Sequence, residues 1–248
     1  MQSIHFRGIG NVKSGKYEDV IIDGIAKIKG AICSNSICIN SKSTIKGSVT
    51  TGSTIVNGAC NIKGDISSNL LNNSGYLKVK GKSICKDITN HGKYSTTSEI
   101  KSEVFTSDGV VKSRSDIEVQ KFIANGPIII KGMLQADTAD ITVKGVGFIN
   151  QIKAKIVHTG KLRDVRLRPS VDILARLVLA PLSGIKITLN RININMIEGT
   201  LVDISFTNAE LIRGEKVTIG PGCRVNRVEY AKSIEVSEDS YIGKKIKV

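Results

Sequence analysis

Small residues recur along this chain at intervals that are multiples of seventeen. One series consists of Gly24, Gly58, Gly75, Gly92, Gly109 and Gly126, with Ser41 in its remaining place. A second series consists of Gly30, Gly47, Gly64, Gly81 and Gly132, with Ser98 and Ser115 in its two gaps. A fixed period of this kind is the signature of a repeat architecture, in which each repeat stacks on the next. The small residues therefore mark two corners of every repeat.

Aliphatic residues between the corners keep the same period and form three columns. The columns are Ile28, Ile45, Ile62, Val79 and Ile130; Ile32, Val49, Ile66, Ile100, Ile117 and Leu134; and Val20, Ile37, Leu71, Ile88, Phe105 and Phe122. Seventeen residues are too few for a βαβ unit, but they suit one coil of a parallel β-helix. We therefore predict an all-β fold, a parallel β-helix with coils of about seventeen residues and three inward-facing apolar walls.

The residues before the first glycine series predict how the corners are made. They are Asp23, Asn40, Asn57, Ser74, His91, Asp108 and Asn125, and most are types that hydrogen-bond local backbone in turns. We expect the glycine that follows to supply a positive φ. This position also makes His91 a turn residue and not a catalytic base.

The period predicts four segments. Residues 1–18 form a short polar lead, and residues 19–160 form the β-helix. Residues 161–182 form a basic linker with a short helix at 171–180, which either covers the open end of the coil stack or lies on a membrane surface. Residues 183–248 form a smaller C-terminal β segment, in which Ile185, Val202, Ile219 and Val236 are again seventeen apart.

The chain is basic, with 36 Lys and Arg against 22 Asp and Glu, and a net charge of +14. Six of the cations follow the first apolar column and should form a ladder up one outer edge: Lys29, Lys46, Lys63, Lys80, Arg114 and Lys131. The ladder is either a solvated face or a site for an acidic partner, such as anionic lipid, a polyanion or an acidic filament neighbour. Aromatic residues are only 4%, so base stacking has little support and nucleic acid is an unlikely partner.

Motifs for chemistry are missing from the sequence. The stretch from Gly10 to Lys16 matches a phosphate-binding loop except that Tyr17 stands where Ser or Thr must bind magnesium. The five cysteines form no CxxC pair, which indicates neither a closed set of disulfides nor a zinc ribbon. No signal peptide or membrane-spanning segment is evident. We therefore expect a cytoplasmic protein that is not an enzyme, with no cofactor, metal or small-molecule substrate.

Several motifs resemble those of the bactofilins, the polymer-forming cytoskeletal proteins of bacteria. In the first part these are Ile28-Lys29-Gly30, Ile45-Lys46-Gly47, Ile62-Lys63-Gly64 and Val56-Asn57-Gly58. In the C-terminal part, Ile197-Glu198-Gly199, the stretch from Val217 to Cys223, and Val228-Glu229-Tyr230 resemble the tail of a longer subgroup. The resemblance implies a right-handed β-helix that polymerises end to end without nucleotide. It also implies a scaffold for cell shape, the envelope or motility machinery.

Polymerisation also has a physical basis, because the end coils of a β-helix offer unpaired strand edges unless something covers them. We predict that the polymer interface contains Val20, Ile22 and Ile28 at one end and Ile234, Val236 and Ile242 at the other. The expected partners are further copies of the chain, another bactofilin-like protein, or an anionic membrane at its inner face. The alternative function is a monomeric β-helix binding module for an acidic partner, either anionic lipid or a polyanion.

Overall fold

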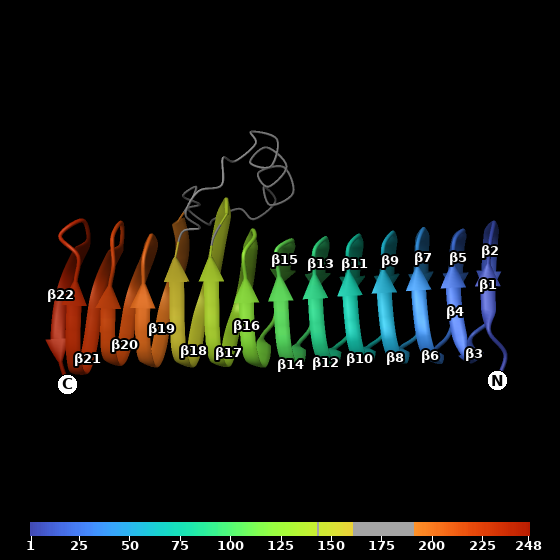
Figure 1. The fold of residues 1–248 in the computed structure, drawn as a ribbon, viewed down its shortest axis with the longest axis horizontal. Coiled ribbons are helices and arrows are strands. Elements are labelled where there is room, and N and C mark those ends of the chain that lie inside the picture. Colours follow the sequence, from blue (N-terminus) through green and yellow to red (C-terminus); the bar gives the residue numbers. More distant parts are fainter. Residues whose placement is uncertain (143, 161–190) are drawn as a thin grey trace. The chain divides into compact units, whose positions relative to one another are not determined.

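A computed structural model describes residues 1–142, 144–160 and 191–248 of the chain (Figure 1). These residues form parallel strands that wind into a β-solenoid, and none of them is helical. The predicted all-β, parallel β-helix architecture is therefore confirmed. The helix predicted at 171–180 lies outside the described residues. The chain divides into two compact units, Met1–Gln120 and Lys121–Val248, called here the first and second units.

Short strands build the first unit. Its opening strands are β1 (Ile4–Phe6), β2 (Ile9–Val12), β3 (Gly15–Lys16) and β4 (Asp19–Ile22). Four-residue strands follow: β5 (Ile25–Ile28), β7 (Lys42–Ile45), β9 (Ala59–Ile62), β11 (Tyr76–Val79), β13 (Lys93–Thr96) and β15 (Val110–Ser113). Eight-residue strands alternate with them: β6 (Ile32–Ile39), β8 (Val49–Val56), β10 (Ile66–Asn73), β12 (Ser83–Asn90), β14 (Ile100–Ser107) and β16 (Ile117–Ala124), which spans the division between the units.

From β6 onward, each coil of the first unit contains one eight-residue strand and one four-residue strand. Corresponding residues of successive coils pair at an offset of seventeen, as in the register of Ile28 with Ile45 and of Ile45 with Ile62. Side chains alternate inward and outward along a strand. Ile28 and Leu71 are 0% exposed and Val49 is 1% exposed. The described members of all three predicted columns are buried, which confirms the three apolar walls.

Polar residues that interrupt the columns are satisfied inside the core. Thr54 is buried, and its hydroxyl hydrogen-bonds those of Thr51 (2.8 Å) and Ser68 (3.2 Å). The buried Tyr94 donates its hydroxyl proton to Ser83 at 2.6 Å. A buried hydroxyl costs little free energy when it is hydrogen-bonded. These substitutions therefore leave the coil geometry intact.

The corner glycines are required for a different reason from the one predicted. None of the first series in this unit has a positive φ. A Cβ at Gly75 would lie 1.9 Å from the carbonyl oxygen of Gly58, and one at Gly92 would lie 2.0 Å from that of Gly75. Carbon and oxygen atoms cannot approach so closely. Glycine is needed because the corner of one coil stacks directly on the backbone of the previous corner.

Side chains at the corners hydrogen-bond from coil to coil. Asn40 donates its amide to Asp23 and Asn57 donates its amide to Asn40, both at 2.8 Å. Farther along, His91 Nδ1 lies 2.8 Å from Asp108 Oδ1. His91 thus occupies the predicted corner position. Its side chain bonds the same position of the next coil, Asp108, whereas the prediction was a hydrogen bond to the local backbone of its own turn.

The first eighteen residues are not a polar lead, contrary to the prediction. β1 pairs with β4, β2 with β5 and β3 with β6, all in parallel. Residues 4–16 are therefore the first coil of the stack. The offset in this coil is sixteen for Ile4 with Val20 and for Ile9 with Ile25. This one-residue difference places the coil outside the period of seventeen.

Longer strands build the second unit. Besides the end of β16 they are β17 (Ile128–Thr142), β18 (Val146–Gly160), β19 (Arg191–Ile204), β20 (Thr207–Ile219), β21 (Arg224–Val236) and β22 (Tyr241–Lys247). Each pairs in parallel with the next. β18 pairs directly with β19, so residues 191–248 continue the same stack of coils. They do not form the separate C-terminal segment that was predicted.

Coil length varies in the second unit. The offset is eighteen for Leu134 with Ile152, but fifteen for Val202 with Val217. Val202 and Ile219 are therefore not stacked, and this part of the predicted column is wrong. Ile219 and Val236 do pair. The described turns between these strands differ in length. The long strands therefore stay in register although successive coils contain different numbers of residues.

Candidate interaction surfaces

The first coil presents an open edge. In the described part of the chain β1, β2 and β3 each pair on one side only, so their other edges have no strand partner. Ile4 and Phe6 are half-buried and Ile9 is 84% exposed. Unpaired parallel edges with apolar neighbours are templates for strand addition. This coil is the candidate docking surface at the N-terminal end.

The predicted N-terminal interface residues do not lie on that edge. Val20, Ile22 and Ile28 belong to the second coil and are 0% exposed. They are covered by the first coil, in which Ile4 is in register with Val20 and Phe6 with Ile22. The prediction placed the N-terminal end of the coil stack at the second coil, because it assigned residues 1–18 to a polar lead outside the stack. The exposed positions are those of the first coil.

The other predicted interface residues lie in the last coil. β22 pairs only with residues Arg224 to Tyr230 of β21, so the end of β21 that contains Ile234 and Val236 is an edge among the described residues. Both are half-buried, as is Ile242 in β22. Three lysines, Lys244, Lys245 and Lys247, also lie on β22. Charged side chains on an edge strand, lysine above all, oppose edge-to-edge association.

The basic ladder forms as predicted in the first unit. Lys29, Lys46, Lys63, Lys80 and Arg114 are exposed and follow strands that stack in register. The backbone N–H of a ladder residue bonds the apolar residue that precedes the ladder residue of the previous coil, as in Lys46 N–H to Ile28 O and Lys63 N–H to Ile45 O, both at 2.8 Å. Lys131 is exposed in the second unit. No ladder cation forms an ion pair within the described residues.

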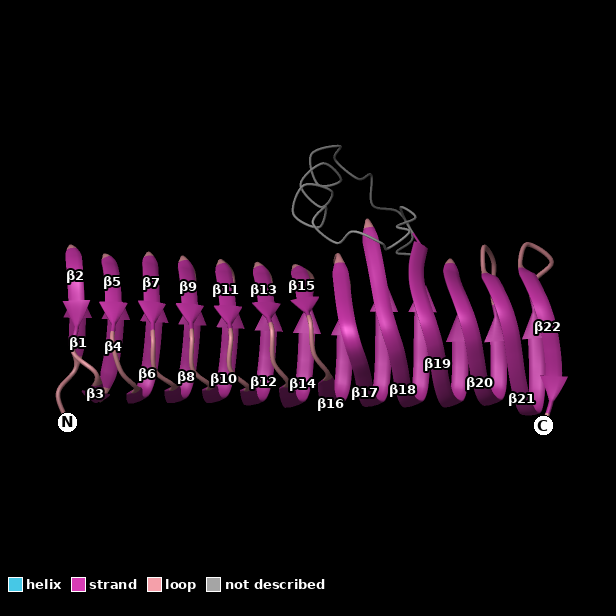
Figure 2. Ribbon diagram, turned by 180° about the vertical axis from the view of Figure 1, so that it is seen from behind, coloured by secondary structure: helices cyan, strands magenta, loops and turns pink. Residues whose placement is uncertain are grey.

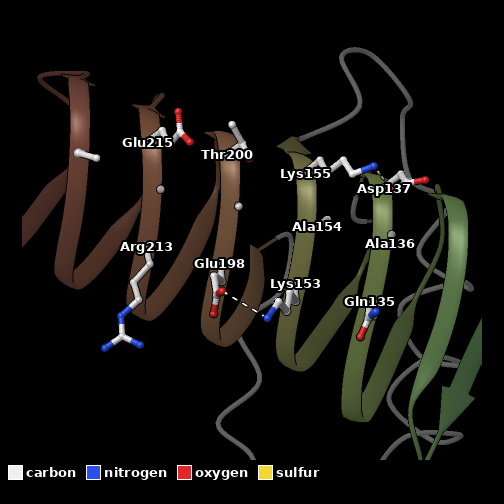
Figure 3. A pocket seen from close by; sticks show the side chains of 13 residues that line it. Gln135, Ala136, Asp137, Lys153, Ala154, Lys155, Glu198, Thr200, Arg213 and Glu215 are labelled. Carbon is white, nitrogen blue, oxygen red and sulfur yellow. Dashed lines mark ion pairs between the residues drawn. The ribbon is translucent and has the colours of Figure 1, made fainter. Parts of the chain in front are cut away.

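A shallow groove runs along the second unit. Its floor is a column of small residues in register, Ala136, Ala154, Gly199 and Gly214. A Cβ at Gly199 would lie 2.7 Å from the carbonyl oxygen of Ala154, so the bend of the strand leaves no room for a side chain. The groove is bordered by two rows of polar and charged residues (Figure 3): Gln135, Lys153, Glu198 and Arg213, and Asp137, Lys155, Thr200 and Glu215.

Charges of the groove pair across neighbouring coils. Lys155 Nζ lies 2.8 Å from Asp137, and Lys153 Nζ lies 3.5 Å from Glu198 (Figure 3). Glu229, whose side chain is 11% exposed, accepts hydrogen bonds from Arg213 Nε at 2.6 Å and Arg227 Nη2 at 2.5 Å. The hydrogen bond from Arg213, with the charges of both guanidinium groups, lowers the pKa of Glu229. The groove thus satisfies its charges internally.

Nucleophilic and metal-binding groups do not converge in the described part of the chain. No group of three His, Cys, Asp or Glu residues there could hold a metal ion. Burial raises the pKa of the Cys60 and Cys85 thiols to about 12. Cys60 lies in the core beside Ser43. Among the described residues, no helix is long and apolar enough to cross a membrane.

Two curated proteins of Bacillus subtilis (strain 168) are similar to parts of this chain. The uncharacterized protein YhbF is 39% identical over 54 residues, which are 22% of this chain and 23% of YhbF. The uncharacterized protein YhbE is 29% identical over 103 residues, which are 41% of this chain and 37% of YhbE. The match thus spans less than half the length of either relative. No family model and no solved structure matches the chain.

Sequence reasoning missed the first-coil edge and the groove. The edge was hidden because Ile4 and Phe6 are one residue out of the period. The groove was hidden because Lys153 and Glu198 are far apart in sequence and meet only when β18 pairs with β19. Small residues, Ala or Gly, at the middle of the long strands were the one available signal for the groove floor.

Proposed function

We propose that this protein is a cytoplasmic scaffold that assembles end to end into filaments without nucleotide, as the resemblance to bactofilins implies. The observation that carries the proposal is the pair of open strand edges. One lies on the first coil at β1, β2 and β3, and the other lies on the last coil at β22 and the end of β21. Each edge exposes backbone groups that a further coil can pair with.

Energetics support assembly at these edges. Half-buried apolar residues lie at both: Ile4 and Phe6 in the first coil, and Ile242 and Ile246 in the last. Burying apolar surface contributes about 25 cal/mol per Å². Each docked coil would also add a ladder of backbone hydrogen bonds of the kind that connects every neighbouring pair inside the stack. No phosphate-binding loop or bound nucleotide is required for such an interface.

A function in cell shape, the envelope or motility machinery follows as part of the same proposal. The filament partners are further copies of the chain or another bactofilin-like protein. In this proposal the first and last coils serve for assembly, and the outward faces of the coils serve for attachment.

Negative-stain electron microscopy of the purified protein without nucleotide tests the proposal. Filaments are expected for the wild type. Phe6→Asp and Ile242→Asp place a charge on the first and last coils and should abolish filaments or shorten them strongly. Ile84→Asp is the matched control, because Ile84 is 52% exposed and lies on β12, away from both edges.

Circular dichroism and sizing separate loss of assembly from loss of folding. Both end variants should keep a β-type spectrum and elute as monomers. Ile22→Asp, by contrast, places a charge in the core and should unfold the opening coils. Folded wild-type protein that forms no filaments, or filaments of normal length from both end variants, would overturn the proposal.

A further inference from the structure

Charge is segregated on one outer face of the first unit. This face contains the outward positions of β2, β5, β7, β9, β11, β13 and β15, with the residue after each strand (Figure 2). It holds eleven cations: Lys13, Lys27, Lys29, Lys42, Lys46, Lys63, Lys78, Lys80, Lys93, Lys112 and Arg114. No carboxylate occupies any of these positions. We call this surface the basic face.

The outward positions of the long strands are balanced in charge. Along β6, β8, β10, β12 and β14 they hold two cations, Lys86 and Lys101, and two carboxylates, Asp87 and Glu103. The first unit therefore has carboxylates available, but none lies on the basic face. A solvated surface of mixed charge is the usual arrangement for a soluble domain. The segregation indicates a one-sided interaction with a negatively charged partner.

The ladder in the middle of this face is not neutralised by the protein itself. Lys29, Lys46, Lys63 and Lys80 stack in successive coils, about 4.8 Å apart along the direction of hydrogen bonding. Like charges that are directly opposite on neighbouring strands destabilise a sheet. Lys101 on the long strands, in contrast, pairs with Glu118 at 2.8 Å and Glu99 at 3.2 Å.

Dimensions of the basic face match an extended surface better than a single strand of nucleic acid. Seven strands span roughly 30 Å along the stack, and the first to fifth positions of each span about 13 Å across it. The cations are spread over both directions. Proteins that bind single-stranded nucleic acid combine a groove with aromatic side chains for stacking. Here the one ring among the outward positions, that of Tyr76, already has Lys93 Nζ at 5.2 Å from its centre.

Apolar side chains on the same face point to a lipid interface. Ile9 is 84% exposed and Ile25 is 46% exposed, and the two are adjacent in register on β2 and β5. Surfaces that combine lysines with exposed aliphatic or aromatic residues bind the headgroup region of anionic bilayers. Lysine also predominates over arginine, whereas bidentate recognition of nucleic-acid phosphates favours arginine.

We propose that the basic face of the first unit binds the surface of an anionic lipid bilayer. The lysines lie against the headgroups, and Ile9 and Ile25 enter the interface at one end of the face. The face runs along the side of the coils and leaves the first-coil edge open. This inference therefore does not depend on filament formation, and a single rod could bind in the same way.

Flotation of the full-length protein with vesicles tests the inference. The vesicles are phosphatidylcholine alone or phosphatidylcholine mixed with phosphatidylglycerol. Binding is expected only to the mixed vesicles and should weaken as salt rises. Each lysine near an anionic membrane contributes a factor of about five. The quadruple variant Lys29→Gln, Lys46→Gln, Lys63→Gln and Lys80→Gln should therefore bind roughly several hundredfold more weakly if all four lysines lie against the headgroups, and about tenfold more weakly if only one or two do.

A matched variant separates the face from net charge. Lys86, Lys121, Lys155 and Lys216 are exposed lysines away from the basic face and from both end coils, and changing all four to Gln removes the same charge. Wild-type binding by this control is expected. Equal losses in both variants would overturn the proposal, as would binding to neutral vesicles.

A second pair of measurements distinguishes lipid from nucleic acid. Ile9→Ser with Ile25→Ser should weaken vesicle binding several-fold while leaving the fold intact, because both side chains are exposed. Binding of labelled single-stranded or duplex oligonucleotides is measured with the same variants. Oligonucleotide binding that depends on the four ladder lysines, without vesicle binding, would overturn the proposal and assign the face to nucleic acid.

Discussion

The two units solve the problem of stacking coils in different ways. In the first unit, short strands end at sharp corners, and Gly75 and Gly92 stack where no Cβ fits. In the second unit, strands of 13 to 15 residues from β17 to β21 bend without ending. Beyond its first coil, the first unit keeps a coil length of seventeen residues at its stacked corners. The long bent strands of the second unit are joined in coils of different length.

The two units also differ in how their charged side chains are arranged. The first unit gathers cations on one face without carboxylates among them, while the second pairs cations and carboxylates of neighbouring coils, as in Lys155 with Asp137. Pairs across coils satisfy the charges of the second unit internally. In the first unit, the ladder lysines Lys29, Lys46, Lys63 and Lys80 form no ion pair among the described residues.

The largest effect is expected from breaking a stacked corner. Gly92→Ala places a Cβ 2.0 Å from the backbone oxygen of Gly75, which cannot move without displacing a whole coil. We expect a loss of roughly 2–4 kcal/mol in the free energy of unfolding. Urea unfolding followed by circular dichroism measures it.

Gly147→Ala is the matched change in the second unit. Its Cβ would lie 3.0 Å from the side chain of Ile192, which can shift. A loss of about 1 kcal/mol or less is expected. Equal losses at Gly92 and Gly147 would show that the two units do not differ in how tightly their coils stack.

This contrast explains how much of the fold was predictable. Ile28, Ile45 and Ile62 could be assigned to one wall because every coil between them has seventeen residues. Val202 could not be aligned with Val217, because the coil that connects them has fifteen residues. This coil turns at Phe206, whose φ is 51°, and a positive φ at a residue other than glycine cannot be recognised from the sequence. The ladder was found because it follows the period. The rest of the basic face was missed because Lys27, Lys42 and Lys93 belong to other columns.

Low pH should lower the stability of the second unit, because Glu229 becomes protonated. Arg213 and Arg227 lower the pKa of this carboxyl in the folded state. The stabilisation is therefore present above the ordinary pKa of glutamate and is lost as pH falls through the lowered value. Thermal unfolding as a function of pH should show this loss for the wild type and a flatter acid limb for Glu229→Gln. An identical acid limb in the variant would exclude Glu229 as the cause.

Thiol labelling follows the opening of each unit separately. At pH 8, Cys33 is exposed and should react first, while Cys60 and Cys85 should be protected because burial raises their pKa to about 12. Cys223 is buried in the second unit, near its last coil, where fraying is easiest. With rising urea, mass spectrometry should therefore detect labelling of Cys223 before that of Cys60. The reverse order would mean that the first unit opens more easily.

The smallest expected effect is a change in stability when one surface lysine is removed, and its sign should differ between the two units. Lys63 has Lys46 and Lys80 as its neighbours on the ladder, so Lys63→Gln relieves repulsion and should raise stability by a few tenths of a kcal/mol at low salt. Lys155 pairs with Asp137 at 2.8 Å on an exposed surface, so Lys155→Gln should lower stability by about 0.2–1 kcal/mol. Both effects should shrink in concentrated salt, because exposed charges are screened. Stability changes of opposite sign for the two variants at low salt, both approaching zero at high salt, would mean that the ladder lysines lower the stability of the first unit. This is expected of a surface whose function is to bind an anionic partner. The same sign for both changes would remove that part of the contrast.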